Sequence, residues 1–290
     1  MFLNQKYEQQ TFLSKFIKKE ACEMHPVIAL SDIHGQLLVF PALAKLRLKY
    51  PEAEVVFLGD YQDSFHHHTG VSVAQKIQAM QVANPNKIFA IQGNHDAAAW
   101  ESLTGQNEYW LEMGGEDIIA ETMAIEGRSP ADMTEAITMF KHEHVGLFDW
   151  IGALPLNIQI GKLFFVHAGL ELSLADPIED TLPHNKYWLR EDYWYGKNAP
   201  NYAHNPLDCA IVTGHTPTGL ITGLYDGSAA ATTLRNRTVS PRGVLTVQYE
   251  NEYARFFIDG GNHSSTAAHI GNIAVFDADN GTLLEAIEDN

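Results

Sequence analysis

The amino-acid sequence predicts an α/β fold built on a parallel sheet. Three short apolar runs of strand length, at residues 27–30, 55–58 and 88–91, are separated by segments with helical periodicity. This alternation is typical of a parallel sheet that is covered on both faces. The 290 residues are 45% hydrophobic and 19% charged, a composition typical of a globular chain that can bury a large core.

The segments between these strands carry clear helix signals. Residues 36–50 have leucines at helical spacing, and Pro41 is compatible with a helix only near its start. Pro51 ends this helix. Residues 71–82 form the second predicted helix, which stops at Asn84-Pro85.

The rest of the chain divides into a helical part and a strand-rich part. Helices are predicted at 116–126 and 132–144, so residues 100–150 are interpreted as a helical insertion in a single domain covering 1–290. Strand signals follow at 163–166, 210–212, 244–247, 255–258 and 273–276. Asp279-Asn280-Gly281 favours a hairpin. Residues 1–25 are expected to form an N-terminal helical arm.

Charge and composition exclude several classes of function. The formal net charge is −17 and the basic residues form no stripe, so nucleic acid is not an expected partner. No apolar run reaches the length of a membrane span, so no membrane association is expected. Cys22 and Cys209 are too few for a disulfide framework, which favours a reducing, cytoplasmic location.

Polar residues follow five of the predicted strands at their C-terminal ends. They are Asp32 and His34, Asp60, Asn94 and His95, His167, and His215. Because ligands of open α/β sheets bind at the carboxyl ends of strands, these side chains are expected to converge. Carboxylate, amide and imidazole groups are ligands for divalent ions, and no thiolate is present to favour a softer metal.

The number of these residues predicts two metal ions. One ion would take Asp32, His34 and Asp60. The other would take Asp60, Asn94, His167 and His215. Asp60 is shared because one carboxylate can bridge two cations. Manganese is the expected metal, with iron, zinc or magnesium as alternatives.

These motifs resemble the signature blocks of the calcineurin-like metallophosphoesterases, most closely the branch that holds phosphoprotein phosphatases and bacterial symmetrical diadenosine tetraphosphate hydrolases. The five blocks are Asp-Ile-His-Gly (32–35), Gly-Asp-Tyr-Gln-Asp (59–63), Gly-Asn-His-Asp (93–96), Val-His-Ala-Gly (166–169) and Gly-His-Thr-Pro (214–217). Two further segments, 108–115 with Trp…Gly-Gly and 187–191 with Trp-x-Arg, resemble the same branch. The resemblance implies a four-layer α/β/β/α sandwich of two mixed sheets.

The resemblance also implies roles for individual residues. A hydroxide bridging the two metals near Asp60 would attack phosphorus. His95 matches the general acid of the family, and Asp63 matches the carboxylate that orients it. Arg190 matches an arginine that binds the substrate phosphate, and Asn94 would contact the same phosphate. At Ser64, however, the resembling phosphatases carry a second phosphate-binding arginine.

One expectation follows from the missing arginine, and the position of His263 is a separate question. One of His66, His67 and His68, or Lys76, would partly replace it. His263 lies in a segment that resembles the last strand and turn of the family, where a crevice position and a turn position are both compatible with the sequence.

The expected activity is hydrolysis of phosphate monoesters, in the manner of Ser/Thr protein phosphatases, so the expected partner is a phosphoprotein or a small phosphoester. Without the second arginine, binding of a monoester dianion should be weaker. Diadenosine polyphosphates, or other diesters and pyrophosphates, are therefore an alternative class of substrate. A third alternative is a metal-binding scaffold without turnover. A complete metal set together with His95 and Asp63 argues against it.

Overall fold

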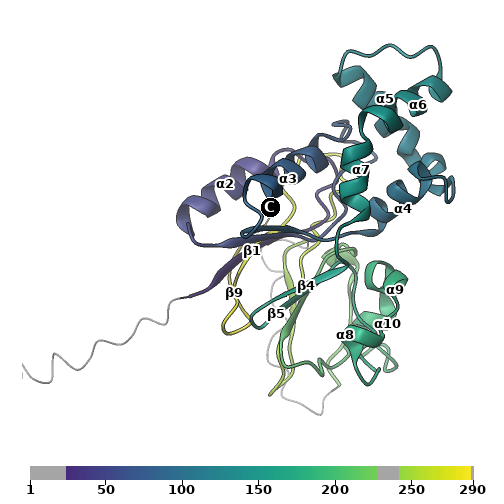
Figure 1. The fold of residues 1–290 in the computed structure, drawn as a ribbon. Coiled ribbons are helices and arrows are strands. Elements are labelled where there is room, and N and C mark those ends of the chain that lie inside the picture. The colour runs from purple at the N-terminus through teal and green to yellow at the C-terminus, as the bar shows by residue number, and fades with distance from the viewer. Residues whose placement is uncertain (1–23, 227–241, 289–290) are drawn as a thin grey trace, which may run out of the picture.

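Two five-stranded mixed sheets form the centre of the computed structural model, which describes residues 24–226 and 242–288 (Figure 1). The first sheet has the strand order β10-β9-β1-β2-β3. Its strands are β1 (Pro26–Leu30), β2 (Glu54–Phe57), β3 (Ile88–Ala90), β9 (Ile273–Asp277) and β10 (Thr282–Ile287). β1, β2 and β3 are parallel, whereas β9 runs antiparallel to both β1 and β10.

The second sheet has the order β4-β5-β6-β8-β7. Its strands are β4 (Asn157–Ile160), β5 (Leu163–Val166), β6 (Ala210–Thr213), β7 (Leu245–Val247) and β8 (Arg255–Phe257). β5, β6 and β8 are parallel, and the edge strands β4 and β7 are antiparallel to their neighbours. Each sheet therefore has three parallel strands whose carboxyl ends point to one edge.

Alternating side chains of the strands build two different cores. Val27 and Ala29 of β1 pack in the core between the sheets, where Phe256 and Phe276 meet with ring centroids 4.9 Å apart. Ile28, the intervening residue, packs with the helices instead. This period of two explains why the strands are apolar on both faces. A third cluster covers the outer face of the second sheet, so the four-layer order is confirmed.

Helices cover the outer face of the first sheet and extend beyond it. α2 (Val39–Lys49) and α3 (Ser72–Ala83) lie over the sheet, while α5 (Glu116–Ile125) and α6 (Met133–Glu143) project away from it (Figure 1). The other elements of this part are α4 (Asn94–Leu103), the kinked turn η1 (Leu111–Gly115) and α7 (Val145–Gly152). Short helices α8 (Pro177–Asp180), α9 (Pro183–Trp188) and α10 (Glu191–Trp194), with the 3₁₀ turn η2 (Thr218–Leu220), lie beside the second sheet.

The sequence patterns located most of these elements, and the differences have simple causes. The first helix begins at Val39, so Pro41 lies in its first turn as expected. Asp279-Asn280-Gly281 joins the antiparallel strands β9 and β10. The expected arm at 1–25 lies almost entirely outside the described residues, and the single-domain description of 1–290 stays a prediction.

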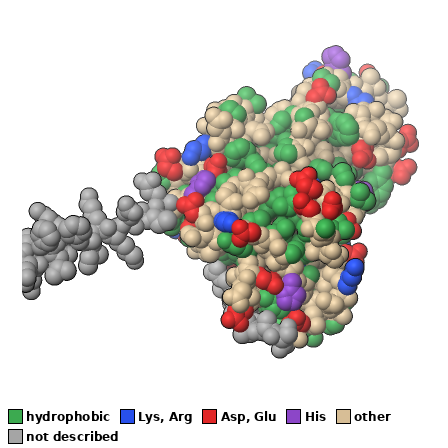
Figure 2. Space-filling model, turned by 60° about the horizontal axis from the view of Figure 1, so that its bottom comes forward, with side chains coloured by type: hydrophobic (Ala, Val, Ile, Leu, Met, Phe, Trp, Pro, Cys, Tyr) green, Lys and Arg blue, Asp and Glu red, His purple; other side chains and the backbone are tan. Residues whose placement is uncertain are grey.

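Acidic residues outnumber basic ones, 36 to 19, which gives the formal net charge of −17. On the face drawn in Figure 2, Asp and Glu are more prominent than Lys and Arg. Within residues 24–226 and 242–288, none of the helices is both long enough and apolar enough to cross a membrane.

Candidate metal and phosphate site

Four of the predicted site residues have a positive φ angle, a backbone conformation that residues other than glycine rarely adopt. The φ angles of Asp32, His34, Asp60 and His215 are 50°, 45°, 58° and 66°. Each residue lies in a turn directly after a parallel strand. Left-handed conformations of this kind cost free energy and concentrate at functional sites. The strained backbone after each strand therefore orients these side chains toward the site.

The glycines of the motifs allow the turns to approach one another. A Cβ on Gly93 would lie 2.2 Å from Oδ1 of Asp60, and one on Gly214 would lie 2.1 Å from Oδ2 of Asp32. Both distances are far below van der Waals contact, so any larger residue would displace a carboxylate. Glycine in the Gly-Asn-His-Asp and Gly-His-Thr-Pro motifs thus serves the packing of the site.

One group of side chains converges on the Oδ1 atom of Asn94. This oxygen lies 3.0 Å from Nε2 of His167 and 2.8 Å from Nδ1 of His215. Oδ2 of Asp60 is 3.4 Å from the same Nε2. Nδ1 of His167 donates to the carbonyl of Leu58 at 2.7 Å, which directs the other ring nitrogen into the cluster.

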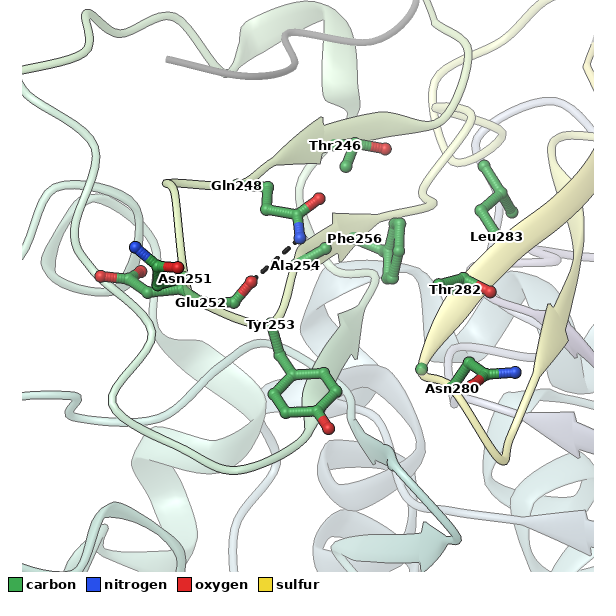
Figure 3. A pocket seen from close by; sticks show the side chains of 11 residues that line it. Thr246, Gln248, Asn251, Glu252, Tyr253, Ala254, Phe256, Asn280, Thr282 and Leu283 are labelled. Carbon is green, nitrogen blue, oxygen red and sulfur yellow. Dashed lines mark hydrogen bonds between the residues drawn. The ribbon is translucent and has the colours of Figure 1, made fainter. Parts of the chain in front are cut away.

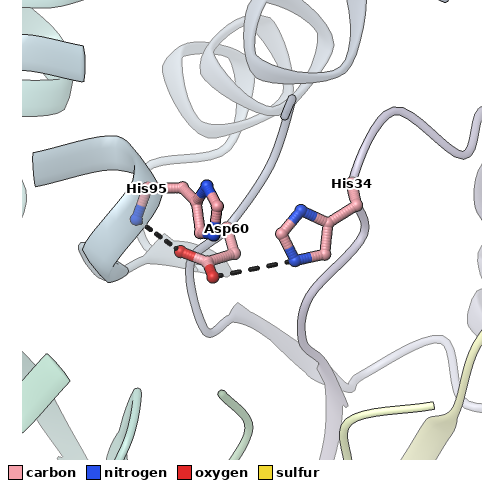
Figure 4. A group of neighbouring side chains, drawn as sticks. All are labelled: His34, Asp60 and His95. Atoms are coloured by element: carbon pink, nitrogen blue, oxygen red, sulfur yellow. Dashed lines mark hydrogen bonds and ion pairs between the residues drawn. The ribbon is translucent and has the colours of Figure 1, made fainter. Parts of the chain in front are cut away.

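A second group lies on the other side of Asp60. Nε2 of His34 is 3.7 Å from Oδ2 of Asp60 and 3.8 Å from Oδ1 of Asp32. Nδ1 of His34 donates to the backbone carbonyl of Asp63, which orients the ring. Figure 4 shows the Asp60 carboxylate between the ring of His34 and the backbone N–H of His95. The six predicted metal ligands therefore lie together, with Asp60 common to both groups. Ligand atoms of His34, Asp60 and His95 also lie within 4.8 Å of one another, as do those of Asp60, His167 and His215.

The ionisation of these groups reflects their burial. Burial is the largest cause for Asp32 and raises its pKa to about 6, with attraction to His167 acting in the opposite direction. Burial also acts to raise the pKa of Asp60, but attraction to His167 and His95 prevails and holds it well below its usual range. Burial lowers the pKa of His34 and His215, which favours the neutral imidazole that binds metals.

The donor set fits divalent metal ions. Oδ1 of Asn94 and Oδ2 of Asp60 lie 3.0 Å and 3.4 Å from Nε2 of His167 in a buried position. Burial acts to lower the pKa of His167, but attraction to Asp60 and Asp32 raises it to about 10, so this nitrogen carries a proton whose place a divalent ion can take. Nε2 of His215 is also buried and has no hydrogen-bond partner among the described residues. Carboxylate, amide and imidazole donors suit the borderline-to-hard ions expected from the sequence.

His95 and Asp63 form a pair at the edge of the metal-ligand groups. Nδ1 of His95 lies 3.0 Å from Oδ2 of Asp63, which also accepts a hydrogen bond from Nε1 of Trp110 at 2.7 Å. Burial by itself would lower the pKa of His95. Attraction to Asp60 and the hydrogen bond to Asp63 outweigh this effect and raise the pKa to about 9. The imidazole is therefore suited to hold a proton near neutral pH.

Two residues that support the site were missed as functional from the sequence. Asp96 is completely buried and accepts hydrogen bonds from the backbone N–H groups of Asp60 at 2.7 Å and Gly93 at 3.0 Å. Asn262 donates to the carbonyl of Asp32 at 3.2 Å. Because both act on backbone groups, their type alone gives no signal, although Asp96 ends the Gly-Asn-His-Asp motif.

Arg190 lies on the side of the site that carries His215. Its guanidinium donates to Oγ1 of Thr216 at 2.9 Å, and it is half-buried. Nearby, the ring of Trp188 is 5.8 Å from that of His215. A cleft of about 230 Å³ opens beside Asn94 here, and its lining includes Tyr109, His184, Tyr187 and Trp188. A leaving group with an aromatic ring would find stacking surfaces in this cleft.

Three of the four residues expected to replace the missing arginine contact other groups instead. Nε2 of His67 is 2.9 Å from the carbonyl of Ser265, and His68 pairs with Glu121. His66 is exposed, and the ammonium of Lys76 lies 4.4 Å from the ring of Phe40 on the α2–α3 surface. None of these contacts directs a side chain at the metal-ligand groups.

His263 reaches the site from the segment between β8 and β9. Its ring centroid lies 4.6 Å from that of His34 and 4.8 Å from that of His95. Of the two positions compatible with the sequence, the structure has the crevice position.

A larger cavity lies at the opposite ends of the strands. It has a volume of about 460 Å³ and is lined by residues 246–256 and 280–283, which include Gln248 and Glu252. Figure 3 shows the side chain of Gln248 donating to the carbonyl of Glu252, at 2.9 Å. The cavity lies at the start of β8, whereas the predicted ligands follow the ends of β1, β2, β5 and β6. Size alone therefore does not identify the site.

Known proteins resemble this chain in sequence and in fold. A PP2A-like serine/threonine-protein phosphatase of Candida albicans is 27% identical over 149 residues, which are 51% of this chain and 30% of that protein. The chain thus spans less than a third of this relative. A protein serine/threonine phosphatase structure from Saccharomyces cerevisiae matches with a TM-score of 0.51 and 15% identity, covering 93% of this chain and 81% of that one.

A metallophosphoesterase from Sphaerobacter thermophilus has a TM-score of 0.46 at 14% identity, with 89% of this chain and 86% of that chain covered. The sequence profile described as calcineurin-like phosphoesterase matches residues 25–247. This match contains all six predicted metal ligands and most of the chain. The protein therefore belongs to the calcineurin-like phosphoesterase family.

Proposed function

We propose that the protein is a dimetal phosphatase that hydrolyses phosphate monoesters, with phosphoserine or phosphothreonine side chains as the first substrates to consider. The observation that carries this proposal is the shared position of Asp60 between two ligand groups, directly beside the His95–Asp63 pair. The PP2A-like relative supports the choice of substrate, although it is matched over a minor part of its length.

In this proposal the ligands divide between two ions in the way expected from the sequence. Asp32, His34 and Asp60 would hold one, and Asp60 with Asn94, His167 and His215 would hold the other. Bound divalent ions, with manganese as the proposed metal, supply an ionised water near neutral pH and neutralise charge on the phosphoryl oxygens.

The remaining residues supply proton transfer and orientation. Nδ1 of His95 donates to Asp63, so Nε2 is the atom that delivers a proton to the leaving oxygen. Trp110 fixes Asp63 by its own N–H bond. Arg190 would offer N–H donors to the phosphate from the His215 side. The side-chain amide of Asn94, whose Oδ1 lies 2.8 Å from Nδ1 of His215, would offer a further donor.

A second candidate activity is hydrolysis of diadenosine polyphosphates or other phosphoanhydrides and diesters. The aromatic cleft beside Asn94 favours it, because Tyr109, Tyr187 and Trp188 offer faces on which a base can stack. The serine at position 64 favours it as well, since an anhydride is bound with less dependence on a second arginine. A scaffold without turnover needs neither the His95–Asp63 pair nor the cleft.

A direct rate comparison tests the proposal. The Mn²⁺-loaded protein is assayed on a phosphoserine peptide, p-nitrophenyl phosphate, bis-p-nitrophenyl phosphate and diadenosine tetraphosphate. We expect the highest kcat/KM on a monoester. A preference for diadenosine tetraphosphate would select the second candidate, and two bound metals without turnover of any substrate would select the scaffold.

A substitution of the shared carboxylate, Asp60, tests the proposed mechanism. Asp60→Asn should lose at least one metal, and activity should fall by about 10³ or more because both ions depend on this side chain. Metal content is measured by mass spectrometry of the dialysed protein. An active Asp60→Asn protein would contradict the proposed mechanism.

A further inference from the structure

His263 is held at the mouth of the site by contacts on several sides. Its ring packs against His34 and His95, with centroids 4.6 Å and 4.8 Å away. Phe65 packs against it at 4.4 Å, and the backbone N–H of Phe65 donates to the carbonyl of His263 at 3.2 Å. The preceding residue, Asn262, is bonded to the backbone of Asp32. Both the ring and its backbone are therefore positioned.

The ring nitrogens of His263 have no hydrogen-bond partner within the part of the chain that the structure describes. The side chain is half-buried, so it is partly open to solvent and to a ligand. An imidazole carries an N–H donor in its neutral as well as its charged form. A positioned but unused donor at a site of this kind is free to bind a substrate oxygen.

The place of His263 complements that of Arg190. Arg190 approaches from the His215 and Thr216 side, whereas His263 lies next to His34 and the proposed acid His95. A phosphoryl group that contacts His95 and both metals would have one donor on each side. Ser64, where the resembling phosphatases carry arginine, lies in the loop that also contributes Phe65.

We propose that His263 donates a hydrogen bond to a phosphoryl oxygen of the substrate and takes over the function of the arginine missing at position 64. Phe65 supports this function by holding the imidazole ring, which also gives a reason for a phenylalanine that is 58% exposed. The inference rests on the proposed phosphatase function, because it needs a phosphate between His95 and the metals.

Binding of inorganic phosphate to the Mn²⁺-loaded protein is the direct test. His263→Ala should weaken phosphate binding about tenfold, the effect of losing one hydrogen bond to a charged oxygen. KM for p-nitrophenyl phosphate should rise by a similar factor, while kcat changes by less than about threefold because the proposed acid is retained. Phosphate affinity is measured by titration calorimetry, alongside metal content and melting temperature.

Three further variants separate a donor from a packing residue. His263→Gln retains an N–H donor and should bind phosphate within about threefold of the original protein. Phe65→Ala leaves the donor but frees the ring, and a loss of about two- to threefold is expected. His142→Ala, which changes an exposed histidine of α6, is the control and should bind phosphate normally.

The outcomes distinguish this inference from the proposed function. If the original protein turns over monoesters but His263→Ala binds phosphate equally well, His263 is not a phosphate ligand. Equal losses in His263→Ala and His263→Gln would also overturn the inference, because packing rather than donation would then be at work. If the original protein neither binds phosphate nor hydrolyses any phosphoester, both proposals fail.

Discussion

His95 holds a proton because two carboxylates prevail over its burial. Burial alone would lower its pKa, yet Asp60 and Asp63 together raise it to about 9. His95→Asn should therefore retain both metals and lose about 10²–10⁴ in kcat, the usual contribution of a general acid. Turnover of p-nitrophenyl phosphate, with metal content measured on the same sample, checks this. A variant with normal kcat would show that the leaving oxygen needs no proton from His95.

Asp63 should control the alkaline side of the pH–rate profile. Activity requires the protonated form of His95, so the rate should fall as pH rises through the pKa of this group, about 9. Asp63→Asn removes a cause of the raised pKa, and the fall should then begin at lower pH. Trp110→Phe, which removes only a bond to Asp63, should shift the profile less. Profiles of kcat/KM for the three proteins measure this, and an unchanged alkaline limb in Asp63→Asn would separate Asp63 from His95.

Among the elements, the turns after the parallel strands were the most predictable. Their polar residues were evident from the sequence because each follows a buried apolar run, and the parallel sheet then forces the ends together. β4 was missed because only Ile160 of its four residues is fully buried, so its pattern is weak. β10 was implied only by the hairpin signal at Asp279-Asn280-Gly281, because no residue of that edge strand is fully buried.

The supporting residues were less predictable than the ligands. Asp96 binds backbone N–H groups, and a buried aspartate in this role has the same sequence appearance as a helix-capping one. His263 lies in a segment rich in glycine and asparagine, where a turn and a crevice position look alike. Only the packing of that segment against His34 and Phe65 separates the two.

His204 contacts two acidic residues that are distant in the sequence, Asp226 and Glu252. Nδ1 and Nε2 of His204 lie 2.5 Å and 3.1 Å from carboxylate oxygens of Glu252 and Asp226, and the ring stacks on Tyr249 at 3.9 Å. Partial burial acts to lower the pKa of His204, but the two carboxylates raise it overall. The charged ring therefore stabilises the folded state below its unfolded pKa of about 6.5, and this contribution disappears as pH rises through the folded pKa.

His204→Gln should accordingly destabilise the protein by about 0.5 kcal/mol at pH 6 and by less at pH 9, a small value because the ring is partly exposed. Urea unfolding at both pH values and at low salt measures the difference. Lys197→Gln, at an exposed position of the preceding segment, is a suitable control. An equal loss at both pH values would assign the effect to stacking on Tyr249 rather than to charge.

At the scale of the whole molecule, the metal site concentrates negative charge inside an already acidic protein. Asp32, Asp60, Asp96 and Asp259 are all at least 97% buried. Burial and neighbouring carboxylates raise the pKa of Asp96 to about 7 and that of Asp259 well above its usual range. Folding without cations therefore requires that some of these groups take up protons, at a cost in stability near neutral pH.

Metal binding should offset this cost, so the stability of the whole chain should depend on bound ions. An ion present at about 100 times its dissociation constant adds roughly 2.7 kcal/mol. Because about 2 °C of melting temperature corresponds to each kcal/mol in a chain of this size, two ions predict a rise of roughly 10 °C. The measurement is a thermal melt of the protein treated with EDTA, before and after Mn²⁺ is restored. Asp60→Asn removes the shared ligand and one buried charge. EDTA should therefore change the melting temperature of this variant far less than that of the original protein. Equal EDTA sensitivity of the two proteins would mean that the stabilising ions bind somewhere other than at Asp60.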